Sequence, residues 1–337
     1  MTIVAIYLLL LLINLKDQPP SAAANTLQQL LISARPAVEQ TAANNGYLYL
    51  AKYDKPAKYR LAEPLTELLR QCETNDCNAV LMAQTNLPEL VAQHQPLSDF
   101  YQQLLSVPYW YQPIPSDTTE ALPSFFVVYE GQQLLLLQAW LAAQQHDLAK
   151  VTQLLQQDLQ FWRTFLVKNN LLINKLISGA AIKRHFNFAA HIKQQLAPEQ
   201  ASAILPQAWL NAFTEPELSL QLVIASEWAY SNVITETVIL KAPQSSSISF
   251  SEQLEWYLLT PLLKPQASSN QLAATLLAYV NGKSPDTTPW YSWLYNPVGK
   301  ILSSVTQPNY QRYFTPFAEL ETLRQQTIAV SAASSRQ

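Results

Sequence analysis

The sequence predicts an all-α protein, an irregular multi-helix bundle that includes one tetratricopeptide-like helical hairpin. Only 5 of its 337 residues are glycine, whereas β-rich folds and glycine-loop enzymes need more positions with positive φ. Leu, Ala and Gln dominate the composition instead, and all three residues tolerate helix well. Because 49% of the residues are apolar, the chain can bury one large core or two modest ones.

The first 24 residues are expected to be a hydrophobic anchor or a signal peptide, followed by a single helical extracytoplasmic domain at 25–337. Thr2 to Leu15 is apolar except for Thr2 and Asn14. This segment is shorter than the roughly 20 residues that cross a bilayer as a helix. Its length suits the apolar region of a signal peptide, and Ala22 to Ala24 offers small residues for cleavage. No basic residue precedes it, so a short uncleaved anchor, a start codon assigned too late and a buried N-terminal helix remain alternatives.

Between residues 18 and 117 the sequence predicts short elements. We expect a linker and a short helix in 18–45, and an extended piece or a helix start in "NNGYLYLAKYDKP" (44–56). Helical patterns cover 61–71 and 97–105. Three prolines in "SVPYWYQPIPSD" (106–117) exclude helix. We therefore expect that segment to be an extended strap lying on the helices.

The two cysteines, Cys72 and Cys77 in "CETNDC", are predicted to form a disulfide. Two cysteines without a nearby His cannot complete a four-ligand zinc site, and a C-x₂-C redox spacing is absent. In an oxidising compartment such a pair closes a small loop, whereas in a cytoplasm both would be free thiols. Together with the apolar N-terminus, the pair favours a periplasmic protein, either anchored in the inner membrane or secreted across it.

From Phe125 onward the sequence is strongly helical. Residues 125–168 are predicted to form two helices joined by a turn at Gln144 to Asp147, with Asp147 as the N-cap of the second. This hairpin resembles one tetratricopeptide unit, but no second copy follows at a period of about 34 residues. The clearest loops are 241–250 and 282–293. Further helices are expected at 170–196, 199–213, 216–240, 250–263, 268–281 and 309–331.

Several charged residues lie on helix faces that are otherwise apolar. Asp158 is near the centre of the apolar face of 148–166, and Lys175 lies in a helix that is apolar nearly all round. Glu227 shares a face with Leu, Val and Ile. Unpaired buried charges are costly, so we predict a structural polar network of Asp158, Arg163, Lys175, Arg184 and Glu227. The expected pairs are Lys175 with Glu227, and Asp158 with Arg163 or Arg184.

A catalytic interpretation of these residues competes with the structural one. It makes Asp158 and Glu227 the acid/base pair of a periplasmic hydrolase, as in glycoside cleavage, with Lys175 or Arg163 binding an anion. Such hydrolases generally have an open aromatic cleft with several polar groups, and nothing in the sequence marks one. The structural interpretation is therefore favoured, and an enzyme is the less favoured class.

Other functional motifs are missing from the sequence. The histidines His94, His146, His185 and His191 contain no H-E-x-x-H and are expected at the surface or at helix ends. "NPVGKIL" lacks the first glycine of a P-loop, and no G-x-S-x-G occurs. We therefore expect no metal and no cofactor. The aromatic stretches 109–111 and 290–295 are expected to cover a helical core; alternatively they bind a peptide or glycan, or rest on a membrane surface.

The charge balance argues against a nucleic-acid partner. Lys and Arg number 21 and Asp and Glu 24, giving a net charge of −3, and no basic block occurs. Nucleic-acid binding thus lacks its usual electrostatic footprint.

Five stretches resemble an uncharacterised family of Gram-negative bacterial proteins: "CETNDC", the helical run "GQQLLLLQAWLAAQQHDLAKVTQLLQQDLQFWRTFLVKNNLLINKLIS", "NPVGKIL", "NYQRYF" and "LETLR". The resemblance covers most of 44–330 and implies an N-terminal membrane segment followed by a helical extracytoplasmic region. It implies no activity, cofactor or catalytic residue. We therefore expect a non-catalytic, membrane-associated periplasmic protein with a protein–protein interaction or envelope scaffold role. Its partners would be another envelope protein and, through the N-terminus, the inner membrane; the oligomeric state is left open.

Overall fold

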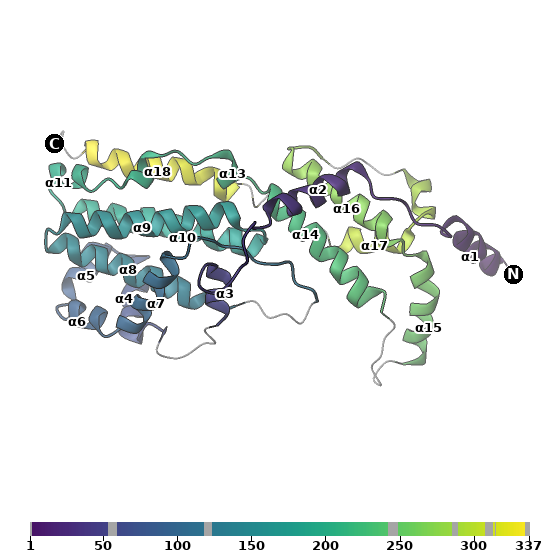
Figure 1. Ribbon diagram of the computed structural model, residues 1–337, viewed down its shortest axis with the longest axis horizontal. Helices are drawn as coiled ribbons and strands as arrows, with labels where there is room; N and C mark the ends of the chain where they lie inside the picture. The colour runs from purple at the N-terminus through teal and green to yellow at the C-terminus, as the bar shows by residue number, and fades with distance from the viewer. Residues whose placement is uncertain are drawn as a thin grey trace.

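The computed structural model describes residues 2–52, 59–117, 123–241, 249–284, 289–306, 313 and 315–333 (Figure 1). Across these residues the regular structure is helical, and the one β-type contact is an isolated bridge between Asn45 and Tyr109. The predicted all-α class is confirmed. The helices gather into two groups, which we call the first lobe and the second lobe.

The first lobe is centred on three long helices that pack side by side, α8 (Phe126–Gln144), α9 (Leu148–Lys168) and α10 (Leu172–Gln194). Helix α18 (Thr315–Ala333) packs along α10 (Figure 1). The Asp147 side chain accepts a hydrogen bond from the Lys150 amide, so the predicted N-cap of α9 is confirmed. The shorter helices of this lobe are α3 (Gly46–Ala51), α4 (Glu63–Cys72), α5 (Cys77–Ala83), α6 (Leu87–Ala92), α7 (Gln95–Leu105), α11 (Pro198–Ala203), α12 (Gln207–Leu210) and α13 (Glu215–Leu218).

The second lobe has its own apolar cluster, formed by α2 (Ala22–Ala34), α14 (Gln221–Ile234) and α16 (Pro265–Val280). Leu172 and Tyr313 pack against both this cluster and the core of the first lobe. That 25–337 forms a single domain stays a prediction. The remaining elements of the second lobe are the π-helix η2 (Thr235–Ile239), α15 (Phe250–Leu259), the 3₁₀ helices η3 (Thr260–Leu262) and η4 (Trp290–Leu294), and α17 (Pro297–Thr306).

The chain passes between the lobes more than once. Helix α2, near the N-terminus, belongs to the second lobe, and the chain then builds most of the first lobe before returning through α14 (Figure 1). Helix α18, near the C-terminus, closes the first lobe against α10. Each lobe is therefore assembled from segments that are far apart in the sequence.

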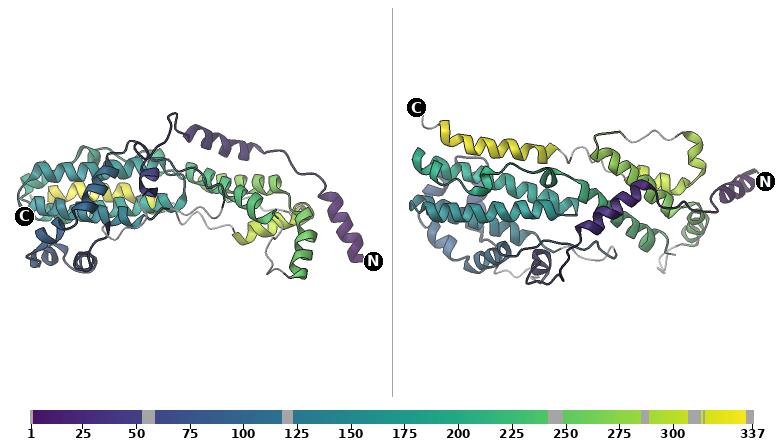
Figure 2. Two further views of the ribbon diagram at one scale, coloured as in Figure 1. Left: turned by 60° about the horizontal axis from the view of Figure 1, so that its bottom comes forward. Right: turned by 45° about the horizontal axis from the view of Figure 1, so that its top comes forward.

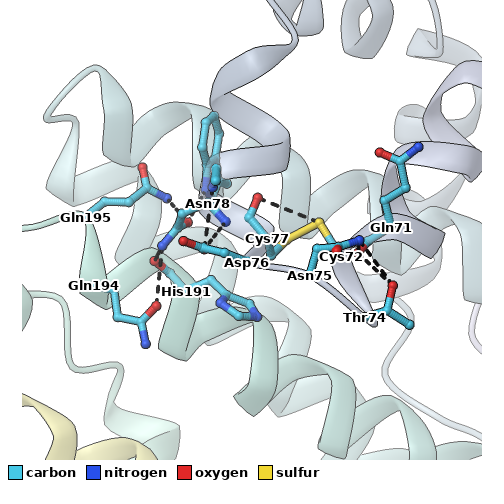
Figure 3. The surroundings of a disulfide bond; sticks show 12 residues. Gln71, Cys72, Thr74, Asn75, Asp76, Cys77, Asn78, His191, Gln194 and Gln195 are labelled. Atoms are coloured by element: carbon cyan, nitrogen blue, oxygen red, sulfur yellow. Dashed lines mark hydrogen bonds between the residues drawn. A yellow bond between two sulfur atoms is a disulfide. The ribbon is translucent and has the colours of Figure 1, made fainter.

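The disulfide between Cys72 and Cys77 is present and joins the end of α4 to the start of α5 (Figure 3). Asp76 caps α5 by accepting from the amide of Asn78. The Asn78 side chain then donates to the His191 carbonyl of α10 at 3.0 Å and accepts from the Trp140 indole of α8 at 2.9 Å. The tight loop thus fixes the start of α5 where it is hydrogen-bonded to two core helices.

Residues 106–117 form no helix, as the three prolines predict, and we keep the name strap for this segment. Asn45 holds it, because its side chain donates to the Tyr111 carbonyl at 2.7 Å and accepts from the Tyr111 amide at 3.2 Å. The Trp110 ring packs edge-on against Phe165 with ring centroids 3.9 Å apart. Only glycine fits at Gly46, since a Cβ there would lie 2.6 Å from the Trp110 ring.

Some predicted boundaries were wrong. The helix expected at 199–213 is divided between α11 and α12, because Pro206 cannot continue the i→i−4 hydrogen-bond ladder. The helix expected at 216–240 is divided into α13, α14 and the π-helix η2. The loop expected at 282–293 includes part of η4, whereas most of the loop expected at 241–250 lies outside the described residues.

Candidate functional site

Asp158 lies at the centre of a polar network inside the first lobe and has no exposed surface. One carboxylate oxygen accepts from the Tyr101 hydroxyl of α7 at 2.8 Å. The other accepts from the Gln132 amide of α8 at 3.0 Å and from His185 Nδ1 of α10 at 2.8 Å. The predicted partners of Asp158, Arg163 and Arg184, do not contact it. Three donors from three helices satisfy the carboxylate instead.

The protonation state of His185 follows from its second partner. Its Nε2 lies 2.8 Å from the Trp209 indole nitrogen, which can only donate. Nε2 must therefore be the acceptor, so Nδ1 carries the proton and donates to Asp158, and the imidazole is neutral. The expectation that His185 lies at the surface or at a helix end was wrong, since it is fully buried in the middle of α10. Its place beside Asp158 and Trp209 explains its burial.

Two further groups connect this network to its surroundings. The Tyr101 hydroxyl accepts from the Trp162 indole at 3.0 Å, and burial, followed by the charge of Asp158, raises the pKa of Tyr101 well above its usual value. Arg184 donates to the Gln132 side-chain oxygen at 2.6 Å and stacks over the Tyr129 ring. Gln132 therefore stands between the Asp158 carboxylate and the nearest guanidinium.

Arg163 and Lys175 lie around a carboxylate that the sequence analysis did not identify, Glu217 of α13. Arg163 donates to both Glu217 oxygens, at 2.5 and 2.8 Å, and also donates to backbone carbonyls near α12. Burial alone would raise the pKa of Glu217, but hydrogen bonds from Arg163 and Thr214 outweigh it, and the pKa is lowered. The predicted pair of Arg163 with Asp158 was wrong, and Arg163 forms its salt bridge with Glu217 instead.

The Lys175 side chain forms no salt bridge in the part of the chain that the structure describes. Its Nζ donates to the carbonyls of Leu166 and Glu217 at 2.6 and 2.7 Å. Burial lowers its pKa to about 8. Glu227, the predicted partner, instead accepts from the Leu172 amide at the start of α10, and burial raises its pKa. The prediction of a Lys175–Glu227 pair was wrong because Glu227 reaches the N-terminus of α10, while Lys175 points to the end of α9 and to α13.

Four of the candidate residues thus lie in two separate clusters, Asp158 and Arg184 in one and Arg163 and Lys175 around Glu217 in the other, and Glu227 belongs to neither. The side chains of Asp158 and His185 are completely buried and hydrogen-bonded to the protein itself, so neither is accessible to a substrate. Among the described residues, no group of three His, Cys, Asp or Glu side chains could hold a metal ion. These buried side chains therefore connect helices to one another and do not form an open site.

The other notable feature is an apolar surface at the far end of the second lobe, which we call the apolar end. It consists of α1 (Thr2–Ile13) with the exposed side chains of α15, η4 and α17. Helix α1 lies at the N-terminal extremity of the molecule (Figure 2). Helix α1 buries none of its side chains. Of the helices within the described ranges, none is both long and apolar enough to cross a bilayer.

The elements of the apolar end are contiguous, because η3 contacts α1, α15 and α17. Its most exposed large side chains are Ile3 at 83%, Phe250 at 80% and Trp290 at 79%. Tyr291 and Trp293 lie next to Trp290 and are also exposed. Soluble monomers rarely expose contiguous apolar patches of more than a few hundred Å², so a group of exposed large apolar side chains on adjoining elements marks a candidate interaction surface.

The segment after α1 is hydrogen-bonded to the second lobe. The Asn14 side chain donates to the Leu294 carbonyl at 2.9 Å and accepts from the Asn296 amide at 2.7 Å. Asp17 accepts from the first amides of α16, and the Asn270 side chain donates to the Pro19 carbonyl. Residues 14–24 are therefore an integral part of the lobe.

Sequence reasoning missed Tyr101, Gln132, His185 and Glu217. The signal available for His185 was its position on an apolar helix face. The same kind of position correctly predicted the burial of Asp158. Comparisons with family models, curated proteins and solved structures found no match to this chain. That the chain belongs to the Gram-negative envelope family it resembles therefore stays a prediction.

Proposed function

We propose that this chain is a non-catalytic, membrane-associated protein of the periplasm that holds a partner protein at the inner-membrane surface. The observation that carries the membrane part is the apolar end. Trp and Tyr are the residues that membrane interfaces favour, because each has an apolar body and a polar edge. Three of them, Trp290, Tyr291 and Trp293, are exposed beside α1.

The length of α1 supports an anchor that enters one leaflet. Its 12 residues extend for about 18 Å at about 1.5 Å per residue, against a hydrocarbon core about 30 Å thick. Fully burying one Leu or Ile side chain contributes about 1.5–3 kcal/mol. Several exposed side chains of α1 together therefore suffice for a stable membrane attachment, to which the aromatic residues of η4 add.

We also propose that the anchor stays uncleaved. Of the two N-terminal alternatives, a cleaved signal peptide fits less well, because cleavage near Ala24 would cut inside α2 (Ala22–Ala34), whose first turn is capped by Ser21. Ala24 itself is buried in the core of the second lobe. The disulfide supports a periplasmic location, since disulfides persist in oxidising compartments. The tetratricopeptide-like character of the α8–α9 hairpin is part of this proposal, and no observation favours the hydrolase alternative.

Vesicle binding tests the membrane part. The full chain is mixed with vesicles of phosphatidylethanolamine and phosphatidylglycerol, and the bound fraction is measured by flotation. Trp290→Ser combined with Trp293→Ser should weaken partitioning at least about tenfold, because each Trp buries roughly 150–250 Å². Phe126→Ser, which removes an exposed aromatic residue of the first lobe, is the matched control and should have no effect. Equal binding by the Trp variant and the wild type would refute the proposal.

A further inference from the structure

A groove lies between the two lobes, and we call it the junction groove. Its volume is about 720 Å³, within the range of about 300–1,000 Å³ that ligand sites occupy. One wall is the end of α2 with residues 35–38; the other is the strap, from Tyr109 to Ser116. The end of α9 and one face of α14 complete the lining. The end of a helix therefore faces an extended segment across the groove.

The charged residues of the junction groove are all basic. Arg35 and Lys168 line it and are exposed, and neither forms a salt bridge within the described residues. No Asp or Glu contributes to the lining, although Glu39 and Asp117 are close in sequence. The groove consequently offers two cations to a ligand and no opposing carboxylate, so its charge complements an anionic ligand.

Unpaired polar atoms are concentrated in and behind the same walls. Of the eleven buried side-chain polar atoms without a partner in the described part of the chain, six belong to Trp110, Gln112, Asn169, Asn170 and Asn174. Three are donors (Trp110 Nε1, Gln112 Nε2 and Asn169 Nδ2), and three are amide oxygens that accept. Trp110 and Asn170 themselves line the groove. Buried polar atoms are nearly always paired in proteins, so the unpaired Trp110 donor and Asn170 acceptor in the lining favour a ligand that carries both an acceptor and a donor.

We infer that the junction groove binds an extended, acidic segment of a partner protein. A peptide backbone carries both carbonyl acceptors and amide donors, which complement Trp110 Nε1 and Asn170 Oδ1. Tyr109 and Tyr111, with Pro113 and Pro115, provide the aromatic and proline surfaces that commonly receive extended or polyproline-like peptides. Acidic side chains of that segment would face Arg35 and Lys168. This inference rests on the partner-binding part of the proposed function and names the class of partner; it does not depend on the membrane part.

Selection from a random peptide library tests the inference directly. Twelve-residue peptides are selected on the full chain held in lipid nanodiscs, with the Arg35→Glu/Lys168→Glu double variant as the counter-selection. We expect selected peptides to combine Asp or Glu with apolar residues. Synthetic copies should bind the double variant about tenfold more weakly than the wild type, and peptides with Gln in place of Glu should lose a similar factor. Lys52→Glu/Lys150→Glu carries the same change in net charge outside the groove and should bind like the wild type.

A second variant examines the aromatic wall. Tyr109→Ala should weaken binding several-fold, and Tyr109→Phe should restore it, because the ring surface supplies the contact. The inference is overturned if the selected peptides carry no acidic residues, or if the double variant binds them as well as the wild type does. It is also overturned if no peptide is selected and an acidic oligosaccharide, such as a heparin hexasaccharide, binds the groove instead. Flotation of the same double variant with phosphatidylcholine vesicles should be unchanged, so failure of the groove and failure of the membrane proposal can be told apart.

Discussion

Replacing Asp158 with Asn should lower the free energy of unfolding by about 3–5 kcal/mol. The change keeps the shape of the side chain and turns one accepting oxygen into a donor. Three donors surround this position, from Tyr101, Gln132 and His185. His185 cannot switch tautomer to accept, because its Nε2 already accepts from Trp209.

The magnitude follows from counting these donors. If the new amide nitrogen faces Tyr101, one donor loses its acceptor, which costs about 1–3 kcal/mol. The two remaining bonds lose their charged acceptor, and hydrogen bonds to charged groups contribute about 1 kcal/mol more than neutral ones. The opposite orientation would leave two donors without an acceptor. Asp158 also partly offsets the buried charge of Arg184, and that contribution is lost as well.

Urea denaturation followed by circular dichroism measures the effect. Asp147→Asn is the matched control, since it makes the same chemical change at the exposed N-cap of the same helix, where Asn caps as well as Asp. The control should stay within about 0.5 kcal/mol of the wild type. Tyr101→Phe should cost less in the Asp158→Asn background than alone, because the hydroxyl has then already lost its acceptor. If Asp158→Asn changes stability no more than Asp147→Asn does, the network does not have the role described above.

Three other outcomes are expected. Because burial lowers the pKa of Lys175 to about 8 and the unfolded value is about 10.4, the unfolded state binds more protons between these values. Stability should therefore rise with pH from about 8 to about 10, by up to about 3 kcal/mol. Lys175→Met should flatten that rise, as seen in urea midpoints at each pH, although Lys193, with a similar pKa, keeps part of it. Replacing Cys72 and Cys77 with Ser should cost about 2 kcal/mol, and non-reducing mass spectrometry of envelope-purified wild type should show the two joined; free thiols would contradict the pairing. Arg163→Met should destabilise by about 3–5 kcal/mol by leaving the buried Glu217 carboxylate without its cation, and a thermal melt that matches the wild type would contradict this.

Local sequence patterns predicted burial well and predicted partners poorly. Helical periodicity placed Asp158 and Lys175 in the core, and both are buried. Their partners come from α7, α8 and α13, whose positions depend on how the chain crosses the fold. Glu217 was hidden because it lies in a four-residue helix inside a stretch expected to be one long helix. Glycine scarcity and proline spacing, which act locally, correctly predicted the helical class and the strap.

The position of α2 has a consequence for the order in which the protein can fold. Leu27 of α2 belongs to the same buried cluster as Ile224 and Leu276, so members of its core are synthesised some 200–250 residues later. At a synthesis rate of about 5–20 residues per second, the apolar face of α2 therefore stays without its packing partners for roughly 10–50 s. Anchoring of α1 at the membrane would keep that face close to the lipid surface during the interval. The last helix, α18, closes the first lobe only at the end of synthesis, so neither lobe can complete its core before the chain is almost finished.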